Sequence, residues 1–279
     1  MWQRDMDLVV PLWQGGDDVR IAAGASALAR LVPASGSRMH MAVSDGRRGA
    51  TDGVCNLELV AQAVRQMRTR MLRRAPRRVL TLGGDCASDL AAIEHLARRH
   101  PGMVVYWVDA HADLNTPASS PTGRVHGMAL RLLLGEGHPA LLGESRLVPS
   151  QVTLVGARSA DPGEVEFVRA ARIDVVDTTR LTADPRSVVA GRSPGTPAYV
   201  HLDMDVCDPA ELAAVACPTP MGPRVGSVAA ALASITAHHD VVGVGVCEYT
   251  PTVEHDVGAV HTLLGALGLM EAEQATASR

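Results

Sequence analysis

The sequence contains no lysine, so all 26 of its basic residues are arginines. This absence excludes Schiff-base chemistry at a lysine and the phosphate-binding lysine of a P-loop. Aromatic residues are scarce, with one Phe among them, and they do not alternate with basic residues along a stripe. Together with a net charge of −4, this composition predicts that nucleic acid is not a partner.

Long hydrophobic runs are also missing. Apolar runs such as residues 241–246 have the length of a strand, whereas a membrane span needs about 20 apolar residues. Arg4, Asp5 and Asp7 interrupt the apolar core that a signal peptide would need. The five cysteines are an odd number without a disulfide framework spacing, which favours free thiols. We therefore expect a cytoplasmic protein with no membrane partner.

Short β-branched runs alternate with amphipathic segments along the chain. We expect strands at 79–82, 103–108, 152–155, 173–177, 198–202 and 241–246, and helices at 17–31, 57–74, 88–99, 128–134, 163–171, 225–238 and 260–270. Such alternation is typical of βαβ units, in which helices cover both faces of a parallel sheet. The Pro/Ser/Gly-rich segments 117–123 and 192–197 are short enough to be loops. The sequence predicts a single three-layer α/β domain over residues 1–279, with a mainly parallel sheet.

Acidic and metal-binding residues follow several of these expected strands. Three motifs stand at strand ends, namely GGDC at 83–86, DAHADLN at 109–115 and DMDVCDP at 203–209, and a fourth strand ends at Glu248. On an extended chain, residues i, i+2 and i+4 point to one side, so Asp109, His111 and Asp113 should converge. Asp203 and Asp205 have the same relation. One such motif alone is typical of a turn or a helix cap, but the combination favours a metal site.

Crowded carboxylates repel one another unless cations neutralise them. Oxygen-rich sets that include an imidazole suit Mn²⁺ or a similar divalent ion. Carboxylates can also bridge two ions, so the motifs predict a dinuclear hydrolytic centre.

In this order, the three motifs resemble the signature motifs of the arginase–agmatinase (ureohydrolase) family. The resemblance extends from about residue 83 to residue 248 and implies a single α/β domain with two manganese ions. It implies that Asp109 and Asp203 bridge both ions. Cys86 and Asp113 would complete one ion, and His111 and Asp205 would complete the other.

Cys86 departs from the family pattern, which has histidine at this position. A thiolate is softer than an imidazole and matches Mn²⁺ less well, so we expect weaker binding of that ion. The alternative is that Cys86 is a buried, inert thiol. If it is a ligand, its thiolate form depends on the bound metal.

The resemblance also implies catalytic roles. Asp113 would accept or hold the proton of the attacking water, and Glu248 would bind the guanidinium. His126 would relay a proton to the leaving amine, which suits the usual pKa of histidine. Other histidines, such as His95, His100, His138, His238 and His239, are interpreted as structural or surface residues.

The loops after the second motif resemble those of arginases that read an amino acid. Asn115, Ser120 and Thr122 match residues that bind the α-carboxylate. Asp161 and Glu164 match residues that hold the α-ammonium, and Asp161-Pro162-Gly163 is expected to form a turn that projects a carboxylate. These matches favour an α-amino acid with a guanidino group over agmatine. Arg124 and Cys217 replace residues that are usual in arginases, so the substrate need not be arginine itself.

Cys86 together with these loops resembles the Nω-hydroxy-L-arginine amidinohydrolase branch of the family, which forms L-ornithine and hydroxyurea in antibiotic (D-cycloserine) biosynthesis. The alternatives are a plain arginase, an agmatinase or other guanidino-acid hydrolase, and an inactive, ligand-binding member. Family members often form trimers or hexamers, so a homo-oligomer is compatible with the resemblance. The tail after Met270 carries no clear assembly signal.

Overall fold

The computed structural model describes residues 1–270 and contains an eight-stranded, fully parallel sheet in the order β2-β1-β5-β10-β9-β6-β7-β8. Its strands are β1 Met6–Val10, β2 Ser37–His40, β5 Val79–Gly83, β6 Val104–Val108, β7 Val152–Val155, β8 Asp174–Val176, β9 Pro197–Asp203 and β10 Asp240–Cys247. A separate antiparallel hairpin joins β3 Ala50–Thr51 to β4 Val54–Cys55.

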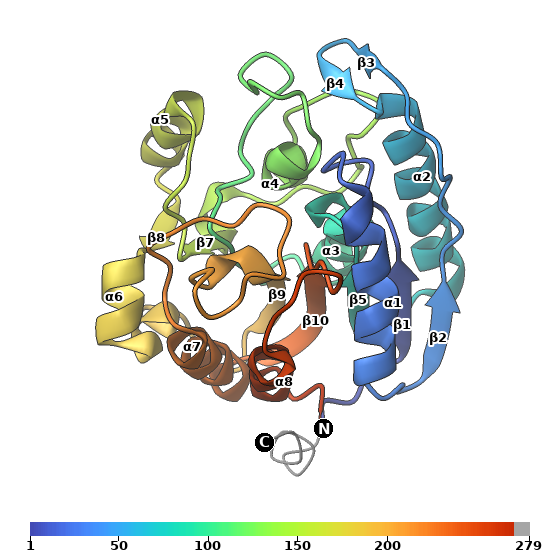
Figure 1. Cartoon of the computed structure of the whole chain (residues 1–279). Coiled ribbons are helices and arrows are strands. Elements are labelled where there is room, and N and C mark those ends of the chain that lie inside the picture. Colours follow the sequence, from blue (N-terminus) through green and yellow to red (C-terminus); the bar gives the residue numbers. More distant parts are fainter. Residues whose placement is uncertain (271–279) are drawn as a thin grey trace.

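Helices cover both faces of this sheet (Figure 1). The helices are α1 Ala22–Leu31, α2 Leu57–Arg74, α3 Leu90–Arg99, α4 Ala129–Leu133, α5 Pro162–Ala171, α6 Thr178–Ala183, α7 Val225–His238 and α8 Val257–Ala266. One apolar core contains residues of α2, α3 and α4 with α5 at its border, and the other contains residues of α1, α6, α7 and α8.

Each central strand contributes alternate side chains to the two cores. In β6, Val105 and Trp107 face the first core, whereas Val104, Tyr106 and Val108 face the second. This alternation follows from the pleat of an extended chain, and burial on both faces explains why such strands are continuously apolar. The predicted three-layer α/β domain with a parallel sheet is confirmed.

Several predicted boundaries were wrong. The segment 17–31 begins with a short 3-10 helix at Val19–Ile21, and α1 starts only at Ala22. Likewise Cys86–Asp89 forms a 3-10 helix before α3. The last helix ends at Ala266 rather than 270, because Gly268 has a φ of +68°, a conformation that ends a helix. The tail after Met270 lies outside the described residues.

The predicted turn Asp161-Pro162-Gly163 is the start of α5. Asp161 is the residue before the first helical turn, Pro162 occupies the first helical position, and the side chain of Glu164 accepts the Asp161 backbone N–H. Such a capping box satisfies backbone donors that a helix start leaves unpaired.

No helix within residues 1–270 is both long and apolar enough to span a bilayer.

Candidate metal centre

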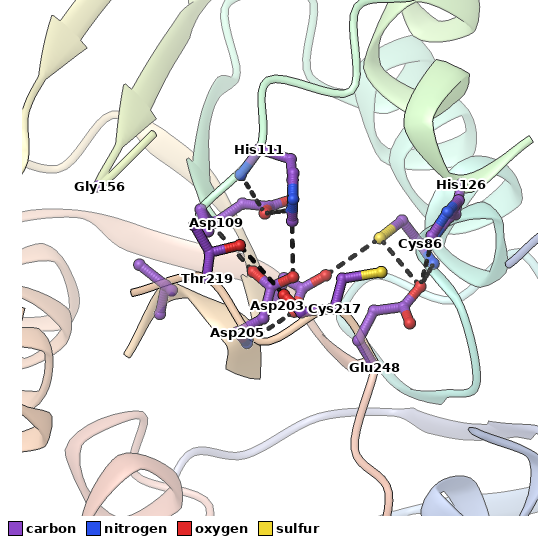
Figure 2. A network of polar contacts seen from close by, with 12 residues as sticks. Cys86, Asp109, His111, His126, Gly156, Asp203, Asp205, Cys217, Thr219 and Glu248 are labelled. Atoms are coloured by element: carbon purple, nitrogen blue, oxygen red, sulfur yellow. Dashed lines mark hydrogen bonds and ion pairs between the residues drawn. The ribbon is translucent and has the colours of Figure 1, made fainter. Parts of the chain in front are cut away.

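Four adjacent strands bring the predicted residues together. β5, β10, β9 and β6 are neighbours in the sheet, and their carboxyl ends lead into the segments that hold Cys86, Glu248, Asp203 and Asp109. The second glycine of GGDC is required by close packing, since a Cβ on Gly84 would lie 1.8 Å from the carbonyl oxygen of Leu12. Figure 2 shows the resulting cluster.

One side of the cluster is built around His111. Its Nδ1 lies 3.1 Å from Asp205 Oδ2 and 3.5 Å from Asp109 Oδ1. The backbone orients the carboxylates, because Asp109 Oδ1 accepts the His111 N–H at 2.7 Å and Asp203 Oδ1 accepts the Asp205 N–H at 2.8 Å. The i, i+2 spacing therefore places an imidazole and two carboxylates within 4.8 Å of one another.

The other side is built around Cys86. Its Sγ lies 3.3 Å from Asp203 Oδ2 and 3.5 Å from Glu248 Oε1. Glu248 Oε1 also lies 3.1 Å from His126 Nδ1 and accepts the Cys86 backbone N–H at 3.3 Å. Asp203 thus lies beside Cys86 through one oxygen, while its other oxygen accepts the backbone N–H of Asp205 (Figure 2).

Burial and mutual repulsion disfavour the anionic forms of Asp113, Asp203 and Asp205, whereas His111 lowers the pKa of Asp109 against the effect of burial. Burial raises the pKa of Asp203 well above its usual range, and Asp205 and Asp109 raise it further. Burial and Asp109 raise the pKa of Asp205 to about 6. Burial opposes a charge on His111, yet its hydrogen bonds to Asp109 and Asp205 raise its pKa to about 12. Without an ion, the protonated imidazole balances part of this negative charge, and a bound cation would take over that role and release the proton.

Cys86 is a thiol in this environment, since burial, and then Cys247 and the nearby carboxylates, raise its pKa well above the ordinary value. A bound cation would have to displace its proton, because only the thiolate is a ligand.

Asp113 and Glu248 carry further marks of a functional site. Asp113 has a φ of +52° and Glu248 a φ of +61°, a left-handed conformation that is uncommon for residues other than glycine. Asp113 Oδ2 and Glu248 Oε2 are buried and have no hydrogen-bond partner within the described chain. Buried oxygens of this kind normally find a partner. The donor set and these free oxygens fit two divalent cations and a cationic substrate.

A cavity of about 170 Å³ opens onto this cluster. It is lined by both metal-type residues and loop residues, in total Cys86, His111, Asp113, Asn115, Ser120, Pro121, Thr122, His126, Gly127, Ser159, Ala160, Asp161, Glu164, Asp203, Asp205 and Cys217. Every predicted site residue except Asp109 and Glu248 is on its wall, and these two lie buried beneath it.

Comparison with known proteins decides the family, since the model of the arginase family matches residues 20–271. The chain belongs to the arginase family. It is 34% identical over 178 residues to an arginase of Bacillus caldovelox, an alignment that covers 58% of each chain. It is 35% identical over 155 residues to an N(omega)-hydroxy-L-arginine amidinohydrolase of Streptomyces lavendulae, over 54% of each chain. The chain therefore matches these curated relatives over little more than half of their length.

The fold extends much further than these alignments. A crystal structure of Entamoeba histolytica arginase in complex with L-ornithine superposes with a TM-score of 0.84 at 21% identity, covering 96% of this chain and 99% of that one. Family membership and fold are thus confirmed. The arginase family generally binds a binuclear metal centre, typically Mn²⁺, which agrees with the donor set found here.

The predicted amino-acid-binding residues of this arginase-family chain differ in how many of their side-chain oxygens already accept hydrogen bonds. Both oxygens of Glu164 already accept backbone N–H groups, from Leu114 at 2.8 Å and from Asp161 at 2.7 Å. One oxygen of Asp161 accepts the Asn115 amide at 2.8 Å. Asp161 therefore has a second oxygen to offer a ligand, whereas Glu164 mainly holds the loop and the start of α5.

Sequence reasoning missed a second layer of residues behind the centre. Asp85 accepts the backbone N–H groups of Gly15 and Gly16 at 2.7 and 3.2 Å and so ties the loop after β1 to the site. Asp89, His201 and Cys247 form a buried set next to Cys86. A signal existed for His201, because it stands two residues before Asp203 on the same strand and so points to the same side.

Proposed function

We propose that this chain hydrolyses the guanidino group of an arginine-type amino acid, and that its preferred substrate is Nω-hydroxy-L-arginine, which water converts to L-ornithine and hydroxyurea. The observation that carries the proposal is one cavity lined by two chemically different sets of residues. One set comprises metal-type residues, among them Asp203, His111 and Cys86, and the other includes Asp161, Ser120 and Thr122.

Each residue of the metal centre and its surroundings has a role that its contacts support. When bound, two divalent ions would activate water and polarise the guanidino group. Glu248 would bind the guanidinium, since a buried carboxylate makes a strong charge-assisted hydrogen bond to such a cation. The free oxygen of Asp113 would take up or hold the proton of the attacking water.

His126 would deliver a proton to the leaving amine. It lines the cavity, and its Nδ1 is held by Glu248 at 3.1 Å. Burial lowers its pKa, but Glu248 and Asp85 together outweigh this effect and raise the pKa above the ordinary value. The upward shift favours the protonated imidazole, which is the form that a general acid requires.

The hydroxyl groups of Ser120 and Thr122 in the cavity lining suit a substrate carboxylate. Ser120 Oγ accepts the Gly123 N–H at 3.0 Å, and Thr122 Oγ1 accepts the Arg124 N–H at 3.3 Å, so their hydroxyl hydrogens remain available to donate. Asp161 would pair with the α-ammonium. An α-amino acid is thus favoured over agmatine, which lacks the carboxylate.

Cys86 is the reason for preferring the hydroxylated substrate. The softer ligand should hold Mn²⁺ less firmly than an imidazole would and let the extra hydroxyl group share the metals. The similarity to the Streptomyces lavendulae amidinohydrolase supports this reading, and a role in antibiotic biosynthesis would follow from it. The second candidate is a plain arginase, which the Bacillus caldovelox relative favours.

Steady-state kinetics of the Mn²⁺-loaded protein on Nω-hydroxy-L-arginine, arginine and agmatine separates these functions. We expect kcat/KM to fall in that order. A preference for arginine would make the protein a plain arginase. A preference for agmatine would refute the proposed recognition of the α-carboxylate. Bound metal without turnover would indicate an inactive, ligand-binding member.

Cys86→His provides the matched variant for the substrate preference. It restores the usual family residue, so Mn²⁺ occupancy should rise and the kcat/KM ratio should move towards arginine. A tenfold shift corresponds to only about 1.4 kcal/mol of transition-state binding, which one ligand change can supply. If occupancy and ratio both stay constant, Cys86 has no part in the preference.

A further inference from the structure

A buried histidine of β9 lies directly behind the proposed centre. His201 is fully buried and precedes Asp203 by two residues, so both side chains leave the strand on the same face. In the sheet register, His201 lies between Gly245 of β10 and Trp107 of β6. Nothing in the three family motifs assigns a role to this imidazole.

Neighbouring residues fix the orientation of the His201 ring. Its Nδ1 lies 2.7 Å from Asp89 Oδ2, and the other oxygen of Asp89 accepts the hydroxyl of Tyr199 at 3.0 Å. Trp107 stacks on the imidazole with ring centroids 3.5 Å apart and an angle of 11° between the planes. In the neutral ring, an Nδ1 proton donated to the carboxylate of Asp89 leaves the lone pair on Nε2.

The sheet makes room for this arrangement. A Cβ on Gly245 would lie 1.7 Å from Asp89 Oδ2, so any larger residue at this position would push the carboxylate away from His201. A histidine whose second nitrogen is bound to a carboxylate in this way is the usual arrangement of a metal-ligating histidine, because the carboxylate fixes the tautomer and makes the ligand more basic.

The imidazole of His201 lies close to ligands of the proposed centre. One ligand atom each of Cys86, Asp109, Asp113 and His201 lies within 4.8 Å of the other three. These four residues are buried. Asp113 Oδ2 has no hydrogen-bond partner within the described chain. Cys247 Sγ also lies 3.6 Å from His201 Nε2 and 3.9 Å from Cys86 Sγ.

We propose that His201 is the imidazole ligand of the ion next to Cys86, and that this position selects a thiolate-accepting ion of the zinc class over Mn²⁺. The inference rests on the proposed two-metal function. The imidazole that the family motif places at position 86 would come here from β9. A set of one thiolate, one imidazole and two carboxylates matches zinc sites, whereas the position at His111, Asp205 and Asp109 has no sulfur ligand and suits Mn²⁺.

The competing interpretation is a core histidine that accepts a weak hydrogen bond from the Cys247 thiol. It predicts that metal binding is indifferent to His201. The two interpretations therefore differ in a property that can be measured without turnover.

The first experiment measures the metal content of the metal-stripped full-length protein after addition of one equivalent of Zn²⁺ per chain in a large excess of Mn²⁺, because zinc displaces manganese from most protein sites when both are in equal supply. We expect one zinc and one manganese ion per chain in the wild type. His201→Gln keeps an amide N–H for Asp89 but removes the imidazole, and should weaken zinc binding by roughly 100-fold or more while manganese remains. His95→Gln is the matched control, because His95 is also buried and bonds only a backbone carbonyl, that of Pro76, at 2.8 Å.

Cobalt gives an independent spectroscopic readout. Co²⁺ added in place of zinc should show a thiolate charge-transfer band that Cys86→Ser abolishes. The visible d–d bands should change in His201→Gln and stay unchanged in His95→Gln. Identical cobalt spectra and zinc affinities in wild type and His201→Gln would overturn the inference.

A crystal structure of the wild type grown with zinc tests the proposal even if the variants fail to fold. Data on both sides of the zinc absorption edge should place the ion about 2.0–2.1 Å from His201 Nε2. A zinc ion bound by Cys86 but not by His201, or two manganese ions under competition, would overturn the inference and leave the proposed hydrolysis intact. A wild type that binds no divalent ion would overturn both.

Discussion

The substitution Glu248→Gln separates the two tasks that we assign to this residue. Glu248 is 1% exposed, holds His126 through one oxygen at 3.1 Å, and has a second oxygen without a partner within the described chain. Glutamine preserves the shape of the side chain and removes its charge. The substituted residue should therefore lose binding of the guanidinium and also change the protonation of His126.

The magnitude follows from the strength of a charge-assisted hydrogen bond. Losing one such bond costs about 1.5–3 kcal/mol, which corresponds to roughly a 10- to 160-fold fall in kcat/KM. Metal content should not change, because Glu248 is predicted to bind substrate and not metal. Loss of bound metal in Glu248→Gln would instead make Glu248 a ligand.

The pH profile tests the second task. Burial lowers the pKa of His126 and the carboxylates of Glu248 and Asp85 raise it, so removing the charge of Glu248 should lower this pKa. If protonated His126 delivers the proton, activity is lost as pH rises through its pKa. The fall of kcat/KM at high pH should therefore begin at lower pH in Glu248→Gln.

The assay is kcat and KM of the metal-loaded protein across the pH range, with Glu166→Gln as control. Glu166 is an exposed glutamate on α5, so its substitution should change neither quantity. Unchanged kcat/KM in Glu248→Gln, or a high-pH fall that moves upward, would refute the roles of Glu248 and His126 together.

Three further predictions concern substrate, stability and metal. Asp161→Asn keeps the cap of α5 but removes the negative charge that would pair with the α-ammonium. The value of kcat/KM should therefore fall roughly 10-fold or more for the amino acid and little for a guanidine without an α-amino group. Equal losses would refute the pairing of Asp161 with the α-ammonium. Asp7→Asn leaves buried Arg4 without its full anionic partner and should lower the free energy of unfolding in urea by about 3–5 kcal/mol. The exposed-pair variant Asp240→Asn should cost at most about 1 kcal/mol, and similar losses in both would contradict the argument. A chelator should lower the thermal midpoint of the wild type, because ions bind only the folded site; Asp109→Ala should abolish this difference together with bound metal and activity.

The central strands could be predicted because local sequence and burial agree there. β6 and β10 are runs of β-branched and apolar residues covered on both faces, and no other structure suits such runs at that length. β1 was missed for a physical reason. It contains Asp7, a fully buried charge that is acceptable only because Arg4 and Arg38 bond it at 2.5 and 2.7 Å.

β2 was missed because it is an edge strand. Its residues Ser37–His40 are half-buried or exposed, so they do not need to be apolar. The start of α3 was misplaced because a 3-10 helix at Cys86–Asp89 precedes it. The side chain of Asp85 caps this 3-10 helix by accepting the Ala87 N–H.

The site motifs could be predicted because neighbouring parallel strands end at one edge of the sheet. Asp109, His111, Asp203 and Asp205 need only their spacing and that edge to meet. The spacing does not reveal how many oxygens of each carboxylate already accept hydrogen bonds from the protein. Glu164 matches an ammonium-binding position by sequence, yet both of its oxygens accept backbone N–H groups.

His201 shows where this limit lies. Its sequence position indicates the face of β9 but not the partner that gives it a function. That partner, Asp89, comes from a 3-10 helix more than 100 residues earlier and reaches His201 only because β10 carries a glycine beside it. Gly245→Ala therefore changes no ligand and no hydrogen-bonding group, yet it should displace Asp89 and weaken the ion next to Cys86. A loss of affinity for that ion alone would show that the absence of a side chain at Gly245 allows Asp89 to hold His201 in place.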